Sequence, residues 1–292
     1  MHRSGFVNII GNPNVGKSTL MNALVGEKLS IITSKAQTTR HRIMGIVSGE
    51  DFQIVYSDTP GILKPSYKLQ ESMMKFVTGA LTDADVILYV TDTVEQSERS
   101  AEIVDSIRRS GIPTVVVINK IDLSTPEALD ALVDKWRQEL PEAQIVPASA
   151  KENFNIEGLF KTILALLPEG PAFYPKETLT DKTLRFFASE IIREKILKFY
   201  DKEIPYCCEI EIDSYREEPT IDRIAATIYV ARDSQKGILI GHKGEKLKRV
   251  GQTAREDMEE FLGKKVFLQL FVKVSDDWRN NERQLRRFGY EL

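Results

Sequence analysis

The chain has 292 residues, of which 42% are hydrophobic, and it carries a formal net charge of −3 at pH 7. This length suggests about two domains, and the apolar content excludes an intrinsically disordered chain. The small negative charge excludes a protein that is basic throughout. Cys207 and Cys208, the two cysteines, are adjacent. We therefore expect no disulfide framework, no cysteine metal site and a reducing, cytoplasmic location.

The sequence has neither the pattern of a signal peptide nor that of a membrane span. The N-terminus reaches Gly11 with an apolar run of only a few residues, which is too short for the core of a signal peptide. No stretch approaches about 18 uninterrupted apolar residues, so we expect no membrane span.

Over residues 1–170, short runs rich in β-branched residues alternate with longer amphipathic stretches. This alternation predicts an α/β domain, with a mostly parallel sheet covered by helices on both faces. The sequence SGED between two of the runs predicts a hairpin and one antiparallel edge strand. The predicted strands are 6–10, 43–47, 52–57, 86–91, 114–119 and 144–147, and the predicted helices are 16–25, 69–81, 97–110, 126–140 and 156–167.

A proline-rich segment separates this domain from a second, smaller α+β domain. The sequence PEGPAFYPKET indicates an inter-domain linker, placed at 171–182. The order then becomes α-β-β-α-α-β over 183–275, followed by a basic tail at 276–292. The predicted helices are 184–200, 236–240 and 245–262, and the predicted strands are 206–214, 221–231 and 266–274.

Residues 11–18, GNPNVGKS, match the phosphate-loop pattern GxxxxGK[ST] between a predicted strand and a predicted helix. Gly11 and Gly16 let backbone N–H groups approach phosphates closely. Lys17 is expected to place its charge between the β- and γ-phosphates, and Ser18 to bind Mg²⁺. The candidate nucleotide-binding residues of this loop are Asn12, Asn14, Val15, Gly16, Lys17, Ser18 and Thr19.

Two further segments are candidates for the metal and the γ-phosphate. Asp58 begins the sequence DTPG after a strand and can hold Mg²⁺ through water, while the N–H of Gly61 can reach the γ-phosphate; a plain turn is the alternative. The polar segment 30–41 contains Thr38 and Thr39, and either can reach the metal unless the segment is only a solvated loop. We assign Thr39, with Lys17 and Gly61, to catalysis, and Ser18, Thr39 and Asp58 to the metal.

The sequence NKID at 119–122 indicates a base-binding site. Asp122 can accept hydrogen bonds from the N1–H and the amino group of guanine, an arrangement that adenine lacks. Asn119 can hold the loop, and the aliphatic stem of Lys120 can cover the base. The N–H of Ala150, in the sequence SAK after another strand, can donate to guanine O6. The candidate residues are Asn119, Lys120, Asp122, Ser149, Ala150 and Lys151.

In the second domain, Gly241 and Gly244 form a GxxG loop between two predicted helices. Residues 236–255 hold six Lys or Arg and one acid, an excess that favours RNA binding in a chain of negative net charge. The alternatives are a plain helix–turn–helix for the loop and a solvated face for the arginines of the tail. We expect residues 238–240 mainly in the core. The candidate RNA-binding residues are Lys236, Gly237, Ile240, Gly241, His242, Lys243, Gly244 and Lys246.

The motifs GNPNVGKS, QTTR, DTPG, NKID and SAK resemble those of translation-factor-like small GTPases. Together with an α-β-β-α-α-β domain that resembles a type II KH domain, they resemble the bacterial Era GTPase family over the whole chain. The resemblance implies GTP and GDP as ligands, Mg²⁺ as cofactor, and binding near the 3′ end of 16S ribosomal RNA in assembly of the 30S subunit. It also implies peripheral contact with the inner membrane. We expect a monomer.

Hydrolysis is expected to be slow, because Ile62 stands where Ras-like GTPases have a water-orienting glutamine. Asn14 is a candidate for holding K⁺ beside the phosphates, or is simply a turn residue. Arg40 and Arg42 are expected on the solvated surface rather than as phosphate clamps. Two other functions stay open: a P-loop ATPase or kinase, and a GTPase whose second domain binds protein.

Overall fold

The computed structural model describes residues 1–94 and 101–290, which form two compact units. Unit 1 comprises residues 1–65 and 73–181, and unit 2 comprises residues 66–72 together with the chain from Lys182 onward. The N-terminal turns of helix α2 are therefore assigned to unit 2, although most of that helix belongs to unit 1. In the described residues, no helix is both long and apolar enough to cross a bilayer.

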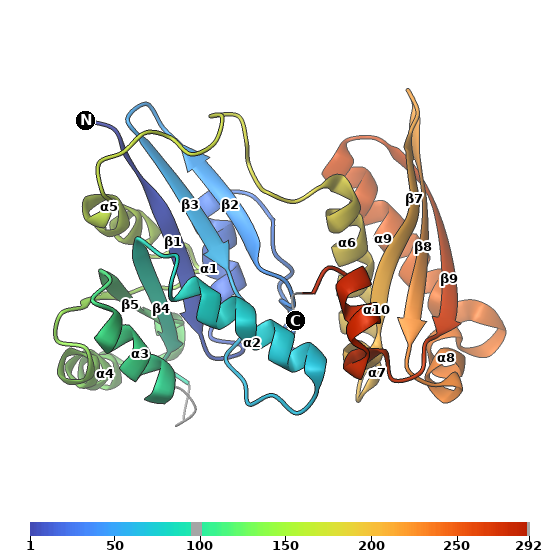
Figure 1. The fold of residues 1–292 in the computed structure, drawn as a ribbon, viewed down its shortest axis with the longest axis horizontal. Coiled ribbons are helices and arrows are strands. Elements are labelled where there is room, and N and C mark those ends of the chain that lie inside the picture. The colour runs from blue at the N-terminus through green and yellow to red at the C-terminus, as the bar shows by residue number, and fades with distance from the viewer. Residues whose placement is uncertain (95–100, 291–292) are drawn as a thin grey trace. The chain divides into compact units, whose positions relative to one another are not determined.

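Unit 1 contains a six-stranded sheet with the strand order β2-β3-β1-β4-β5-β6 (Figure 1). Only β2 runs antiparallel, and it pairs with β3 across the predicted hairpin. All seven residues of β4 are buried, as expected for a parallel strand covered on both faces. The strands are β1 (Arg3–Gly11), β2 (Ile43–Ser48), β3 (Phe52–Asp58), β4 (Val86–Asp92), β5 (Thr114–Asn119) and β6 (Gln144–Pro147).

Helices cover both faces of this sheet, so the α/β prediction is confirmed. One face packs Ile10, Tyr89 and Ile118 against α2, α3 and α4, and the other is covered by α1 and α5 (Figure 1). Part of the predicted helix at 97–110 lies outside the described residues. The helices are α1 (Lys17–Val25), α2 (Lys68–Ala80), α3 (Ala101–Ser110), α4 (Pro126–Glu139) and α5 (Ile156–Leu166).

Most of the segment expected as a linker runs along unit 1. Its residue Thr180 forms an antiparallel bridge with Gly45 of β2, and the N–H of Ile46 donates to Leu179 O at 2.8 Å. Thr180 Oγ1 also donates to Met44 O at 2.6 Å. The segment therefore covers the otherwise unpaired edge of β2, which explains why a proline-rich stretch is ordered there.

Unit 2 is a three-stranded sheet with the order β7-β8-β9, in which β7 and β8 are antiparallel and β8 and β9 parallel. Long helices α6 and α9 pack against one face of it, around the buried residues Ile192, Ile228 and Met258. The elements are α6 (Leu184–Phe199), β7 (Glu209–Glu217), β8 (Ile221–Val230), α8 (Asp233–Ile240), α9 (Glu245–Leu262) and β9 (Lys265–Val274).

Two parts of unit 2 differ from the sequence prediction. Residues Ile204–Cys207 form a short helix, α7, so the strand predicted from residue 206 begins at Glu209 instead. Pro205 favours this because its fixed φ suits the first helical turn. β7 has a bulge between Ile212 and Ser214 and continues past the predicted end at residue 214 to Glu217.

The C-terminal segment is part of the core rather than a solvated tail. Trp278 is fully buried and its Nε1–H donates to Cys207 O at 2.9 Å. Helix α10 (Glu282–Arg287) follows, and Tyr290 donates its hydroxyl proton to Glu209 at 2.7 Å. Cys207 and Cys208 are both buried, and no disulfide joins them in the described part of the chain.

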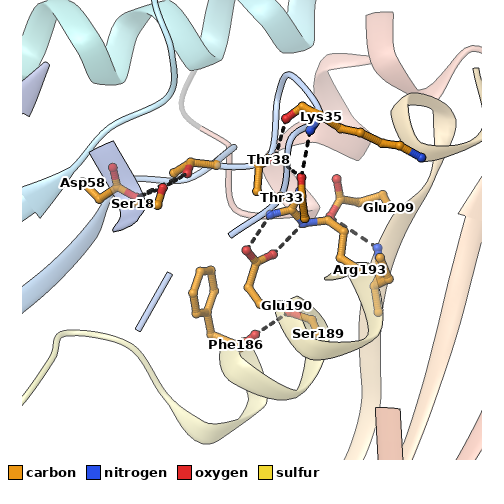
Figure 2. Close-up of polar contacts among 12 residues, drawn as sticks. Ser18, Thr33, Lys35, Thr38, Asp58, Phe186, Ser189, Glu190, Arg193 and Glu209 are labelled. Atoms are coloured by element: carbon orange, nitrogen blue, oxygen red, sulfur yellow. Dashed lines mark hydrogen bonds and ion pairs between the residues drawn. The ribbon is translucent and has the colours of Figure 1, made fainter. Parts of the chain in front are cut away.

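Helix α6 carries charged pairs inside unit 2. Arg193, which is 2% exposed, forms a two-bond ion pair with Glu190 one turn earlier (Figure 2). Lys195 pairs with Glu194 and with Asp257 of α9. These pairs explain why the helix lacks a simple apolar stripe in the sequence, since its charged residues are buried in pairs.

Candidate functional site

The phosphate loop lies between β1 and α1, as the sequence predicts. Gly16 has φ of 98°, and a Cβ there would lie 2.2 Å from Asn119 Nδ2, so only glycine fits. No side chain caps the first turn of α1. Its N–H groups are thus available to an anion, and the helix dipole favours one. Lys17 is 6% exposed, and its Nζ donates to Gly11 O at 3.0 Å and to Asn12 O at 2.8 Å.

Three oxygen-bearing side chains meet beside this loop. Ser18 Oγ donates to Asp58 Oδ2 at 2.7 Å (Figure 2). Thr39 Oγ1 lies 3.0 Å from Ser18 Oγ and donates to the same carboxylate at 3.3 Å. Asp58 is fully buried, and this burial raises the pKa of its carboxyl group. Hydroxyl and carboxylate oxygens at this spacing fit Mg²⁺, a hard cation that prefers oxygen ligands.

An unpaired atom supports the same fit. The second oxygen of Asp58, Oδ1, is buried and has no hydrogen-bond partner among the described residues. A buried carboxylate oxygen normally has one, since leaving it unpaired costs about 1–3 kcal/mol or more. A hydrated metal ion would supply donors to this oxygen through its bound water.

The structure distinguishes the two threonines of segment 30–41. Thr38 Oγ1 donates to Lys35 O at 2.6 Å and lies 2.7 Å from Thr33 Oγ1, so it closes a turn within the segment (Figure 2). Thr39 is the residue that faces Ser18 and Asp58. Sequence reasoning left this choice open because neighbouring residues in a loop have no fixed period.

The sequence after Asp58 contacts the phosphate loop directly. A Cβ on Gly61 would lie 2.8 Å from Pro13 Cα, so glycine is required for the two loops to meet. The next residue, Ile62, is 4% exposed and packs in the core with α2 and α3, while its N–H donates to Gly11 O at 3.2 Å. The side chain of Ile62 therefore points away from the cavity, and its N–H is already used in a hydrogen bond to the phosphate loop.

Asn119 and Lys120, in the NKID segment predicted to bind the base, contact the phosphate loop. Asn119 Nδ2 donates to Val15 O at 2.8 Å. Lys120 has φ of 60°, an uncommon value for a non-glycine residue, and its Nζ donates to Asn14 O at 2.6 Å. Asp92, at the end of β4, forms an ion pair with the same ammonium at 2.5 Å. The sequence offered no signal for Asp92, since its role depends on β4 and β5 being neighbours.

Asp122 is held from one side by Ser149, whose Oγ donates to Asp122 Oδ1 at 2.6 Å. The N–H of Ala150 donates to Asn119 Oδ1 at 3.0 Å and so joins the SAK segment to the NKID segment. Its contact with guanine O6 stays a prediction. The carboxylate of Asp122 retains its second oxygen for a base.

These segments surround one cavity of about 430 Å³ in unit 1. It is lined by the phosphate loop and α1 start, by segment 31–39, and by Gly61, Lys120 and Lys151. The predicted residues therefore converge from five separate stretches of sequence. Of the predicted set, Asn14, Gly16, Lys17, Ser18, Thr19, Thr39, Gly61, Lys120 and Lys151 line the cavity itself.

The expectation that Arg40 and Arg42 lie on the solvated surface is wrong for Arg40, which is 1% exposed. The side chain of Arg42 is 14% exposed. The guanidinium of Arg42 donates to Ser57 Oγ at 2.5 Å, to Asn8 Oδ1 at 3.0 Å and to both carboxylate oxygens of Asp83. Arg42 directly precedes β2, and its side chain extends over β3 at Ser57 to β1 at Asn8, so little of it is exposed.

In unit 2 the GxxG loop lies between α8 and α9. Apart from its chain neighbours, no heavy atom of the described residues lies within 4 Å of where a Cβ on Gly244 would be, so the backbone there is open to an approaching ligand. No side chain caps α9, which begins at Glu245. Lys246 places its ammonium 5.9 Å from the centroid of the Tyr200 ring. An uncapped helix start with cations nearby suits a phosphate.

A groove of about 410 Å³ begins at this loop and runs between α9 and β9. Gly244 is the one member of the predicted RNA set that lines it. Gly251, in the middle of α9, leaves 3.4 Å between its would-be Cβ and Leu270 of β9, which keeps the groove wide. The lining residues that the sequence analysis missed are Leu247, Lys248, Gly251, Gln252, Arg255, Leu268 and Leu270.

The residues at the end of α8 also differ in part from expectation. Leu239 is fully buried, but Ile238 is 44% exposed. The helical spacing of 244, 247, 248, 251 and 255 is the signal that would have found the α9 wall of the groove, because these positions share one helix face.

Two family models match the chain. One, described as a 50S ribosome-binding GTPase, matches residues 6–120, and a KH domain model matches residues 203–279. The chain is 45% identical to "GTPase Era" of Staphylococcus haemolyticus strain JCSC1435, covering 99% of this chain and 97% of that one. It is also 45% identical to "GTPase Era" of Alkaliphilus metalliredigens strain QYMF, covering 99% of each.

Solved structures give the same result. A crystal structure of Era in complex with MgGDPNP and nucleotides 1506–1542 of 16S ribosomal RNA has a TM-score of 0.96 and 41% identity, covering 100% of both chains. A crystal structure of an Aquifex aeolicus Era variant bound to GDP·AlF4⁻ has a TM-score of 0.95 and 41% identity, covering 99% of this chain and 100% of that one.

Proposed function

This chain belongs to the Era family of GTPases, and on that premise we propose that it is a GTP-gated binder of small-subunit ribosomal RNA. Unit 1 binds GTP or GDP with Mg²⁺ and hydrolyses GTP, and unit 2 binds the 3′ region of 16S ribosomal RNA during assembly of the 30S subunit. The proposal of RNA binding is carried by one observation: the open GxxG loop leads directly into the groove between α9 and β9.

The nucleotide is held by residues that lie around one cavity. Lys17 neutralises the β- and γ-phosphates, and the uncapped start of α1 binds them through its N–H groups. Ser18, Thr39 and Asp58 hold Mg²⁺, which neutralises charge that develops on the phosphate oxygens. Asp122 accepts from guanine, with Lys120 over the base and Lys151 beside it. This assignment excludes the ATPase or kinase alternative, because adenine leaves Asp122 unpaired.

Hydrolysis is slow in the isolated protein, because the residue next to Gly61 is Ile62, whose apolar side chain has no group to orient water. Ile62 is directed into the core. We place a monovalent cation, K⁺, beside Asn14 as the group that completes the site. Asn14 lines the cavity and has a left-handed φ of 65°.

Turnover in K⁺ and in Na⁺ tests the cation. The wild-type protein should turn over faster in K⁺, and Asn14→Ala should lose this difference while still binding GDP. Equal rates of the wild-type protein in the two salts would exclude the cation.

RNA is bound through the GxxG loop, where the backbone approaches phosphates, and through the groove, where bases are read. Replacing both His242 and Lys243 by aspartate should abolish binding of a 16S 3′-end RNA and leave GDP affinity unchanged, since these residues lie in unit 2. Intact RNA binding in this variant would favour the alternative that unit 2 binds protein.

The gating is tested by RNA affinity in two nucleotide states. The segment 30–41 and the residues after Gly61 contact the metal site and are expected to change with the γ-phosphate. RNA should bind with different affinity when the protein holds a GTP analogue rather than GDP; identical affinities would contradict the gating. We further propose a monomer in the cytoplasm whose contact with the inner membrane is peripheral. Co-sedimentation with anionic vesicles tests that contact.

A further inference from the structure

The outer face of the unit 2 sheet carries two exposed aromatic rings. On β9 the side chains alternate: Val266, Leu268, Leu270, Val272 and Val274 belong to the core side, and the residues between them face outward. Phe267 is 43% exposed and Phe271 is 50% exposed. Burying a phenylalanine stabilises a protein by about 1.5–3 kcal/mol, so two half-exposed rings on one strand need an explanation.

Both rings stand in a row that is basic and lacks acids. The outward residues of β9 read Lys265, Phe267, Gln269, Phe271 and Lys273. On β8, Arg223 lies opposite Phe267 in the register, and its guanidinium is 5.4 Å from the ring centroid. Lys265 pairs with Glu259 and Arg223 with Glu218, whereas no ion pair of Lys273 is found in the described part of the chain. The face therefore carries three cations next to two rings, and two of these cations are shared with glutamates.

This pattern suits single-stranded nucleic acid better than protein. The two rings are about 13 Å apart along the strand, with the amide of Gln269 between them, so they do not form one continuous apolar patch. Separate rings flanked by cations and an amide are what unpaired bases and their phosphates require, since each base can stack on one ring. The neighbouring outward residue Ala225 is small, which leaves room above the sheet.

Strand β9 also connects this face to the groove. Leu268 and Leu270 line the groove, and Phe267 and Phe271 alternate with them on the opposite side of the same strand. β9 pairs only with β8 and forms one edge of the sheet, so a strand of RNA that leaves the groove reaches the outer face by passing a single β-strand.

We propose that Phe267 and Phe271 form a second RNA-binding surface of this protein, on which bases of a single-stranded segment stack beyond the groove. The surface extends the RNA site of the proposed function, and it predicts that RNA long enough to reach both places binds more tightly than RNA that fills the groove alone. The tighter binding of the longer RNA depends on the aromatic rings of Phe267 and Phe271 and not merely on the apolar area of these side chains.

Two double variants of the full chain separate these requirements. Phe267→Leu with Phe271→Leu keeps apolar area and removes the rings, and Phe267→Tyr with Phe271→Tyr keeps the rings. Binding of labelled single-stranded 16S 3′-end RNA is measured for a segment of about five nucleotides, which fills a KH groove, and for one of about twelve nucleotides. The circular dichroism spectrum and the urea unfolding midpoint check that unit 2, which carries both residues, folds in each variant.

The leucine pair should bind the longer RNA at least about fivefold more weakly than the wild type, and the short RNA equally well. Fivefold is the smallest loss of affinity expected when one base no longer stacks on a ring. The tyrosine pair should bind both like the wild type. Wild-type affinity of the leucine pair for the longer RNA overturns the proposal, and so does a loss of affinity in the tyrosine pair equal to that in the leucine pair. A wild-type protein that binds neither RNA contradicts the groove as well, whereas loss for the longer RNA alone reports on Phe267 and Phe271.

A protein partner is the competing occupant of this face. Its binding would depend on apolar area and would survive the leucine pair. If replacing both rings by serine changes recovery of 30S particles while the leucine pair does not, the face docks protein and the RNA proposal is wrong.

Discussion

Arg42 and Asp83 form an ion pair at 2.5 Å that joins the end of segment 30–41 to the end of helix α2. Arg42 stands at the start of β2, and Asp83 follows α2, whose last residue, Ala80, accepts a hydrogen bond from Asn8 at 2.7 Å. Asn8 in turn binds both Arg42 and Asp83. The end of segment 30–41 and the end of helix α2 are thus tied to β1 through one guanidinium.

Replacing Arg42 by alanine should lower the free energy of unfolding by about 2–3 kcal/mol. The pair with half-exposed Asp83 contributes little, but the buried oxygens of Asn8 and Ser57 lose a charged donor. Urea denaturation measures this change. Arg137→Ala is the matched control, since the Arg137–Asp134 pair is exposed on both sides and should change stability by less than about 0.5 kcal/mol. Equal effects of the two variants would contradict the role of Arg42.

Asp122→Asn should shift nucleotide preference from guanine towards xanthine by about a hundredfold or more. Asparagine presents its amide N–H to the base where the carboxylate accepted, and xanthine has a carbonyl there instead of an amino group. Competition binding of GDP and XDP measures the shift. Ser149→Ala removes the hydroxyl that holds Asp122 at 2.6 Å and should weaken GDP a few-fold without a preference for XDP. Retention of guanine preference in Asp122→Asn would place the base elsewhere.

Thr39→Ala should weaken Mg²⁺-dependent binding of a GTP analogue by about tenfold and leave GDP binding nearly unchanged. Its hydroxyl is the one of the two threonine hydroxyls that lies beside Ser18 and Asp58, and one lost charge-assisted contact is worth about 1.5–3 kcal/mol before water replaces it. Thr38→Ala removes only the bonds to Lys35 and Thr33 and is the control. A larger effect of Thr38→Ala than of Thr39→Ala would reverse the assignment.

Glu259 should make the stability of the protein sensitive to acid. The hydrogen bond from Lys265, with those from the Val266 N–H and Arg255, lowers the pKa of Glu259 from 4.5 to about 2. A carboxyl group whose pKa is lowered in the folded state contributes stability above pH 4.5 and loses it as the pH falls towards 2. Glu259→Gln should therefore be less stable than the wild type at pH 7, with the difference shrinking below pH 4.5.

The midpoint of urea unfolding, measured between pH 7 and pH 3, tests this dependence. Glu157→Gln is the control, because the pKa of Glu157 is lowered by Lys161 alone on the exposed face of α5. Its difference from the wild type should be smaller at every pH. A difference for Glu259→Gln that stays constant down to pH 3 would show that its carboxylate is not the titrating group.

Much of unit 1 could be predicted because its motifs stand at fixed places in a repeating pattern. Each strand-to-helix turn of a parallel sheet ends at the same edge, so GNPNVGKS, DTPG and NKID had to lie close together. The alternation of β-branched runs and amphipathic stretches predicted five of the six strands to within one residue at each end, whereas β1 begins at Arg3 rather than at residue 6. Unit 2 was harder to predict, since the four-residue helix α7 and the packed segment around Trp278 have no periodic signal.

The chemistry of single side chains was determined by the sequence alone: Lys17, Ser18, Asp58 and Asp122 are recognisable by motif, and Ile62 by its apolar character. Only the tertiary structure decided which of two threonines faces Ser18 and Asp58, that Ala150 binds Asn119, and that Arg40 is buried. It also showed the groove between α9 and β9 and the exposed rings behind it. The physical reason is that motifs encode contacts with a ligand along a short stretch of chain, whereas burial and hydrogen-bond partners depend on segments that meet only after the sheets have formed.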